Sequence, residues 1–249
     1  MQVKGRWVSV LAAMVVAGSL VACGGGSDVT VAQVAGVGTI SNSMLEHWMP
    51  IEGRILYSEA PTRPVPAGVV PDPPTYPACI AYLKANPQKA GEQPGKQTTA
   101  QLRARCAHKE HELKELTLNT LIGWDWTIGR GLRLGVKVTD AEAKRRMEVL
   151  RTSDFAGQDF NKYLKYSGQT TADMLLRAKV QVVEDKLGAL QKNLQNNQQG
   201  ANQEQEALVS LAAKVLTDKQ WAQRTNCPSG YVTSGCKQYK GSQAPGIPN

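Results

Sequence analysis

The feature that most constrains this chain is a run of nine prolines between Pro61 and Pro94. Proline fixes φ and removes a backbone donor, so no regular element can run through residues 58–97. One short helical turn, from Ala78 to Leu83, fits between the prolines. Helices and strands must otherwise form before and after this segment. We therefore expect a proline-rich insertion in a fold that is built by its flanks.

Helical patterns dominate these flanks. Apolar residues recur at intervals of three and four, which is typical of helices that bury one face. Thr139 and Glu142 form an S/T-x-x-E capping box, and Gly168 is a stop signal. A polar stretch rich in Gln and Asn, residues 191–207, interrupts the last part of the pattern and is expected to be a linker. The expected helices cover residues 43–57, Thr98 to about Gly131, Thr139 to Arg151, a short helix capped by Ser153-Asp154, a long helix capped by Thr170 or Thr171, and Leu208 to about Arg224.

Strand signals occur near the start of the chain. Val29–Val34 and Val37–Ile40 read as two short strands joined by a turn at Ala35-Gly36. Such a hairpin is marginal alone and needs a helix or a further strand to cover it. The sequence predicts an all-α fold class: an extended helical domain over residues 29–224 with a small N-terminal β-hairpin and the proline-rich insertion, followed by a tail over 225–249.

The first residues have the features of a secretory signal. Lys4 and Arg6 precede an apolar stretch, Trp7–Leu20, that is short for a membrane span. The stretch ends in Leu-Val-Ala followed by Cys23, a pattern that resembles the bacterial lipobox. We expect residues 1–22 to be a signal peptide and 23–28 to be a lipidated tether. Diacylglyceryl and N-acyl chains such as palmitate on Cys23 would hold the protein to the outer face of the cell membrane.

Four cysteines remain once Cys23 is assigned to the lipid, and an exported protein meets an oxidising compartment. Three pairings are formally possible, and sequence proximity favours Cys79 with Cys106 and Cys227 with Cys236. Free or metal-bound thiols are the alternative. The chain contains no C-x-x-C pair, and the cysteine spacings fit no zinc template. We therefore expect two disulfides and no bound metal. The bond between Cys79 and Cys106, rather than a core, is expected to hold the proline-rich insertion against the next helix.

Charge and motifs narrow the classes of function. Removing residues 1–22, with Lys4 and Arg6, lowers the formal net charge from +8 to +6. This surplus of positive charge favours contact with an anionic membrane. The sequence contains no nucleic-acid-binding motif and no interleaved aromatic and basic residues, so we do not expect a nucleic-acid partner. His108 and His111 do not have metalloprotease spacing, so we interpret them as a solvated helix face. The sequence also lacks a nucleophile elbow and a phosphate-binding loop. We predict no catalytic residues and no cofactor.

Several short stretches of the chain, taken in the order in which they occur, resemble the sequence motifs of a known protein family. Val31–Gly36 through Ile40–Met44 resembles the opening strand, turn, strand and helix of the SurA/PrsA-type extracytoplasmic foldases. Other stretches are similar to the N-terminal helical chaperone domain of that family and to the tail of its actinobacterial lipoprotein members. These are Val138–Glu142, Phe160–Leu164, Ser167–Thr170, Leu175–Arg177, Lys219–Cys227, Gly230-Tyr231 and Cys236-Lys237.

One departure from the family pattern decides the expected activity. Foldases of this type commonly carry a parvulin prolyl-isomerase domain before the C-terminal helix, and such a domain needs about 100 residues. Here only the linker 191–207 occupies that place, and it contains neither histidine nor cysteine. The resemblance then implies a membrane-anchored chaperone that binds unfolded or exported polypeptides in an apolar cleft. A prolyl isomerase and a scaffold lipoprotein with a single envelope partner are the alternatives.

Overall fold

The computed structural model describes residues 28–57, 62–87, 97–155, 159–196 and 217–241. The expected signal peptide 1–22, Cys23, and the helix expected to begin at Leu208, up to residue 216, lie outside these ranges. The linker expected over 191–207 lies outside them from residue 197 on, whereas residues 191–196 are helical, which corrects that part of the prediction. The elements are β1 (Thr30–Val34), β2 (Gly38–Ser41), α1 (Asn42–Tyr57), α2 (Pro77–Ala85), α3 (Thr99–Arg133), α4 (Asp140–Val149), the π-helical turn η2 (Leu150–Asp154), α5 (Phe160–Ser167), α6 (Thr171–Asn196), α8 (Asp218–Ala222) and β3 (Thr225–Asn226).

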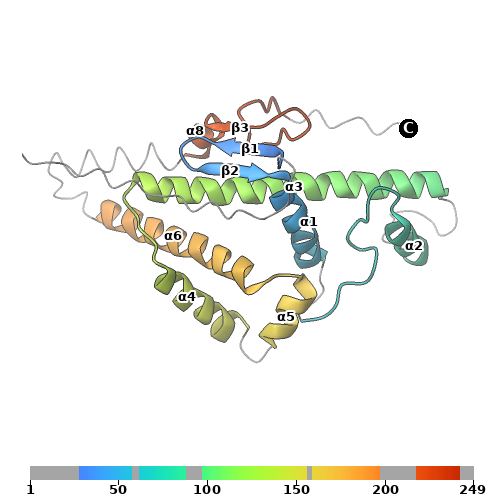
Figure 1. The fold of residues 1–249 in the computed structure, drawn as a ribbon, viewed down its shortest axis with the longest axis horizontal. Coiled ribbons are helices and arrows are strands. Elements are labelled where there is room, and N and C mark those ends of the chain that lie inside the picture. The colour runs from blue at the N-terminus through green and yellow to red at the C-terminus, as the bar shows by residue number, and fades with distance from the viewer. Residues whose placement is uncertain (1–27, 58–61, 88–96, 156–158, 197–216, 242–249) are drawn as a thin grey trace, which may run out of the picture.

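The described part of the chain is mostly helical and includes a small antiparallel sheet. This confirms the coarse fold class expected from the sequence. None of the helices within the described ranges is both long enough and apolar enough to cross a membrane. The long helix α3 runs the length of the molecule, with the sheet on one side and α4 and α6 on the other (Figure 1).

The sheet has the strand order β2-β1-β3, so the predicted hairpin gains a third strand from the C-terminal segment. Gly36 has a φ of 78° in the turn between β1 and β2, a conformation that glycine adopts without a Cβ penalty. The β1–β2 pairing is irregular between Thr30 and Ala32. Such an irregularity can turn consecutive residues toward one face, and Val31 and Ala32 are both fully buried.

The main core lies where the sheet, α1 and the middle of α3 meet. The disulfide between Cys227 and Cys236 packs into it, which ties the C-terminal segment to the hairpin. Trp48 of α1 is buried at the centre and packs edge-to-face against Trp124 of α3, with ring centroids 4.8 Å apart. The buried members of the main core are Val31, Ala32, Ile40, Leu45, Trp48, Ile51, Leu118, Leu121, Ile122, Cys227 and Cys236.

The proline-rich segment has a core of its own. We expected a disulfide alone to hold it, and the structure corrects this prediction. Cys79 of α2 is bonded to Cys106 of α3, and both lie inside a buried cluster with Tyr76, Ile80, Leu83 and Leu102. The correction has a simple cause: α2 is a nine-residue helix rather than a single turn, so it presents an apolar face to α3. Both disulfides have the pairing that sequence proximity favours.

A second helical layer is formed by α4, α5 and α6. Its buried residues are Leu150, Tyr163, Met174 and Ala178, which come from η2, α5 and α6. The expected helix cap at Ser153-Asp154 is wrong. The helix α5 begins at Phe160, because Asp159 accepts a hydrogen bond from the backbone N–H of Lys162 and caps it.

The capping box at the start of α4 is present as predicted. The Thr139 hydroxyl accepts from the Glu142 N–H at 3.2 Å, and the Thr139 N–H donates to the Glu142 carboxylate at 2.8 Å. Replacing Thr139 with alanine should lower the free energy of unfolding by about 1 kcal/mol, because the first turn of α4 loses a backbone partner. Urea unfolding measures this loss, and Thr139→Ser, which keeps the hydroxyl, should lose much less. Equal midpoints for Thr139→Ala and wild type would contradict the prediction.

Candidate functional site

The candidate site is a groove of about 390 Å³ between α1, the proline-rich segment and α3. We call it the proline groove. Its lining is mostly apolar, with prolines from two segments and a methionine that can adapt to different partners. The residues that line it are Asn42, Leu45, Glu46, Met49, Pro50, Val70, Pro71, Pro73, Glu110, Leu113 and Lys114.

The α1 wall of the groove is fixed by capping at its first turn. The Asp28 carboxylate accepts a hydrogen bond from the Ser43 N–H at 3.1 Å, and the Ser41 hydroxyl accepts from the Met44 N–H at 3.2 Å. Hydrogen bonds from the Ser43 hydroxyl, the Ser41 hydroxyl and the Ser43 N–H lower the pKa of Asp28, because they favour its ionised form. A carboxylate at this end also suits the helix dipole. The helix therefore starts at a defined residue, which sets where Leu45 and Met49 lie.

The opposite wall is the proline-rich segment, which is tied to α2 and α3 by polar contacts. The Asp72 carboxylate accepts from the N–H groups of Ala78 and Cys79 at 2.8 and 2.9 Å, so it caps the start of α2. On the α3 side, the Lys109 ammonium donates to the Val69 carbonyl. Together with the disulfide at Cys79, these contacts hold Val70 and Pro71 in place as a preformed wall.

Charged side chains at the edge of the groove are engaged with neighbouring groups. The Tyr76 hydroxyl donates to the Glu110 carboxylate, and this bond raises the pKa of Tyr76 to about 12. Lys114 lies under the Tyr231 ring, 4.1 Å from its centroid. The Tyr231 hydroxyl donates in turn to the Asn42 side chain at 3.1 Å. The C-terminal segment therefore helps to hold the α1 wall of the groove in place. The arrangement offers an apolar surface with a polar edge, which suits binding of apolar side chains.

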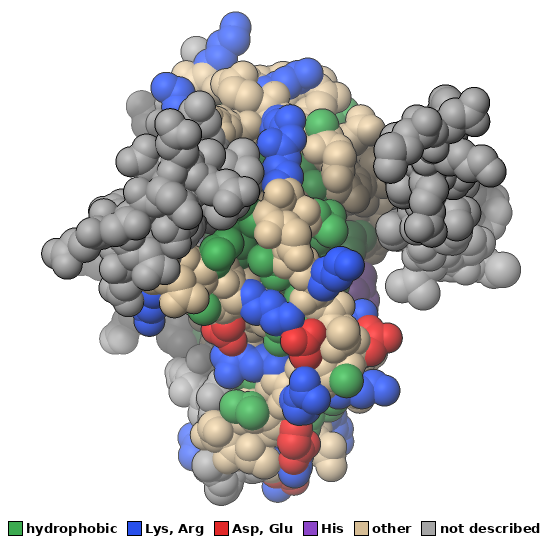
Figure 2. All heavy atoms as spheres, turned by 90° about the vertical axis from the view of Figure 1, so that its left-hand side faces the viewer, with side chains coloured by type: hydrophobic (Ala, Val, Ile, Leu, Met, Phe, Trp, Pro, Cys, Tyr) green, Lys and Arg blue, Asp and Glu red, His purple; other side chains and the backbone are tan. Residues whose placement is uncertain are grey.

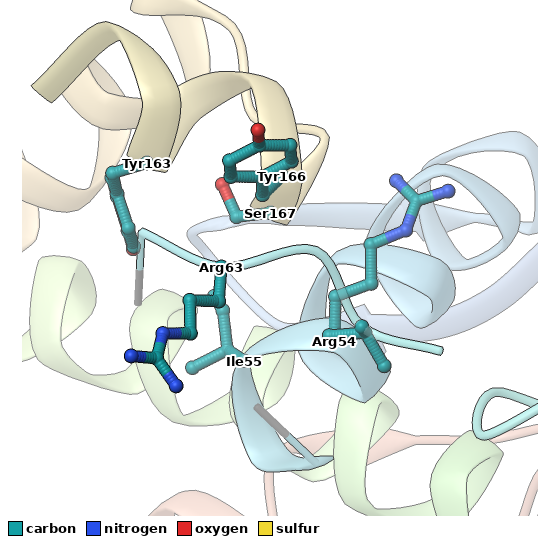
Figure 3. A pocket seen from close by; sticks show the side chains of 7 residues that line it. Arg54, Ile55, Arg63, Tyr163, Tyr166 and Ser167 are labelled. Atoms are coloured by element: carbon teal, nitrogen blue, oxygen red, sulfur yellow. The ribbon is translucent and has the colours of Figure 1, made fainter. Parts of the chain in front are cut away.

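A smaller pocket of about 80 Å³ lies between α1, the proline-rich segment and α5. Arg54 and Arg63 contribute guanidinium groups to it, which would suit an anion if they converged. Figure 3 shows that these two groups point away from one another. The Tyr163 hydroxyl already accepts a hydrogen bond from Gln169 at 2.7 Å. We therefore do not assign an anion site here.

The basic surplus of the chain is not gathered into one continuous patch on the face seen in Figure 2. Lys and Arg side chains are scattered over it, with acidic side chains among them in its lower half. Ion pairs also join α4 to α6: Lys179 lies 2.8 Å from Asp140, and Lys186 lies 2.7 Å from Glu142. The Lys186 contact, followed by the Thr139 bonds, lowers the pKa of Glu142 to about 2.

The histidines singled out from the sequence and the two tryptophans of α3 do not come together in one site. His108 and His111 are exposed on α3, and His108 pairs with Glu112 at 3.3 Å on the same helix. The described residues contain no group of His, Cys, Asp and Glu side chains that could hold a metal ion. Trp124 is partly buried and packs against the main core, and the Trp126 indole N–H donates to the Thr225 hydroxyl at 2.8 Å.

Two features of the site region had no signal in the sequence. His47 of α1 lies 2.9 Å from the Asp173 carboxylate of α6, and the two residues are 126 positions apart. The proline groove likewise combines segments that are far apart in the chain, and it lies beside α1 rather than between the two long helices α3 and α6. Comparison of the chain with family models, with curated proteins and with solved structures gives no significant match.

Proposed function

We propose that this protein is a membrane-anchored extracytoplasmic chaperone that holds unfolded segments of exported polypeptides in the proline groove. The observation that carries the proposal is the groove itself, a preformed apolar hollow of about 390 Å³. This volume falls within the roughly 300–1,000 Å³ typical of ligand pockets. The lipobox-like stretch that ends at Cys23 supports the proposed membrane location, and the resemblance to SurA/PrsA-type foldases supports the proposed chaperone class.

The chemistry of the groove suits a passive binder. Met49 and Val70, which are half-buried, offer apolar contacts of different shape, and the prolines form a wall that loses little conformational freedom on binding. An unfolded segment gains by burying its exposed apolar side chains there, and it leaves again because no covalent step is involved. A groove of this kind selects for apolar character rather than for one sequence.

The test is suppression of aggregation by the purified mature protein. At a near-stoichiometric ratio it should keep a chemically denatured client soluble after dilution. Met49→Glu places a carboxylate in the groove. An apolar client segment that binds there would remove water from this charge without pairing it, so binding should become weaker. We expect this variant to need a severalfold higher concentration for the same protection, as measured by light scattering.

Leu56→Glu is the matched control, because Leu56 is an exposed residue of the same helix outside the groove lining. It should protect the client as well as wild type does. If both variants protect the client equally less than wild type does, the groove is not the site where the client binds. Failure of wild type at severalfold excess would reject the chaperone proposal itself.

A further inference from the structure

Asp125 of α3 carries a carboxyl group for which the described part of the chain provides no hydrogen-bond or ion-pair partner. It lines a small pocket of about 60 Å³, which we call the Asp125 pocket, where β2, α1, α3 and α6 meet. Gly38 lies beside the carboxylate: a Cβ built on Gly38 would come 3.8 Å from Oδ2. The apolar walls of the pocket are Ile40, Met44, Leu121, Trp124, Ile128 and Leu176.

Two titratable side chains of the neighbouring helices, Arg177 and His47, are matched with other partners. Arg177 of α6 lies over the Trp124 ring, 5.4 Å from its centroid, yet its ion pair is with Glu52 of α1. His47 of α1 is paired with Asp173 of α6 at 2.9 Å. Among the residues that the structure describes, Asp125 is therefore left without a countercharge. Burial among apolar walls raises the pKa of its carboxyl to about 6, because the ionised form is poorly solvated there.

We propose that the Asp125 pocket binds the ammonium head of a primary alkylamine, such as the side chain of a lysine. The carboxylate supplies the countercharge, the apolar walls pack against the methylene stem, and the Trp124 ring attracts the cation. The pocket is several times larger than the roughly 10–15 Å³ that one water molecule needs, so it admits the ammonium with the methylene beside it.

The walls argue against a metal ion as the ligand. Calcium and magnesium require about six oxygen ligands, whereas this pocket offers Asp125 and Thr39 as its oxygen-bearing side chains. An ammonium group needs fewer partners, and its attached methylenes gain from apolar contact. This inference goes beyond the proposed chaperone activity, because the Asp125 pocket shares no lining residue with the proline groove.

The experiment compares n-butylammonium with n-butanol, which has a similar stem and no charge. Each is titrated into the mature protein at pH 7.5, and the indole N–H signal of Trp124 is followed by NMR. We expect saturable shifts with the amine, at a concentration at least tenfold lower than with the alcohol. Equal responses to the two compounds, or no response to the amine, would overturn the proposal without any need for a variant.

Asp125→Asn keeps the shape of the side chain and removes its charge. It should weaken amine binding at least tenfold, to the level of butanol, while Asp185→Asn, at an exposed carboxylate of α6, should bind as wild type does. Unchanged amine affinity in Asp125→Asn would also reject the site. A peptide with one lysine and its Nε-acetylated form then identify the source. Binding of only the unmodified peptide indicates a lysine side chain, and binding of butylammonium alone indicates a free amine.

Discussion

Replacement of Trp48 by alanine is expected to lower the free energy of unfolding by about 3–5 kcal/mol, the usual range for truncating a large aromatic side chain in a core. Trp48 is 2% exposed and lies at the centre of the main core. Its ring also lies against groups from two other helices. It packs at 85° to the Trp124 ring, and the Arg177 guanidinium lies 5.1 Å from its centroid.

The size of this effect follows from how many elements meet at Trp48. It joins α1 to α3 through Trp124, and α1 to α6 through Arg177, whose charge is balanced by Glu52 on α1. The alanine variant leaves a cavity that these helices can close only in part, and it leaves Arg177 beside that cavity. The loss therefore includes the buried ring and the contacts that it organises.

Urea unfolding followed by circular dichroism measures the effect of the Trp48 change without relying on tryptophan fluorescence. Trp48→Phe retains an aromatic ring and should lose clearly less stability than Trp48→Ala. A loss below about 1 kcal/mol for the alanine variant would be typical of a surface position. Such a result would contradict the arrangement of α1, α3 and α6 around this residue.

Local patterns in the sequence were enough to predict most of the helices. The capping box at Thr139 and Glu142 involves residues three positions apart, so its physical cause is contained in a short stretch. The two disulfides were also predictable, because each joins cysteines that are near in sequence and fall in a plausible pairing. The hairpin was predictable because Gly36 marks its turn.

Features that depend on distant segments were not predictable in the same way. The strand β3 has only Thr225 and Asn226, too few residues to show alternation, and β1 alone defines it by pairing. The sequence suggested an apolar cleft but not its walls. The proline-rich segment became one of them because Asp72 and Lys109 anchor it, and these contacts depend on the folded arrangement of α2 and α3.

The carboxyl of Asp125, which has no partner within the described ranges of the chain, also had no sequence signal, and it leads to the second large expected effect. Asp125→Asn should raise the free energy of unfolding by about 2–3 kcal/mol at pH 7.5, since each unit of pKa shift corresponds to about 1.4 kcal/mol. The folded-state pKa of about 6 is well above the roughly 3.9 of an unfolded chain. Burial is the cause, and an amide carries no charge to desolvate.

The direction of the pH dependence distinguishes this explanation from a general improvement in packing. Between about pH 4 and pH 6 the folded protein holds the Asp125 proton more tightly than the unfolded chain does. The contribution of Asp125 to stability therefore falls as the pH rises through this window, and the full penalty is present at pH 7.5. Below pH 4 the carboxyl is protonated in both states, so Asp125→Asn and wild type should be nearly equally stable.

Urea unfolding of both proteins at pH 3.8 and pH 7.5 measures the difference directly, with Asp185→Asn as a control at an exposed carboxylate. A stability gain of the same size at both pH values would mean that the amide forms new contacts and that desolvation is not the cause. A loss at pH 7.5 would mean that the carboxylate is stabilised in the folded protein. In either case, the lack of a countercharge for Asp125 among the described side chains would no longer be a reason to expect that the pocket binds a cation.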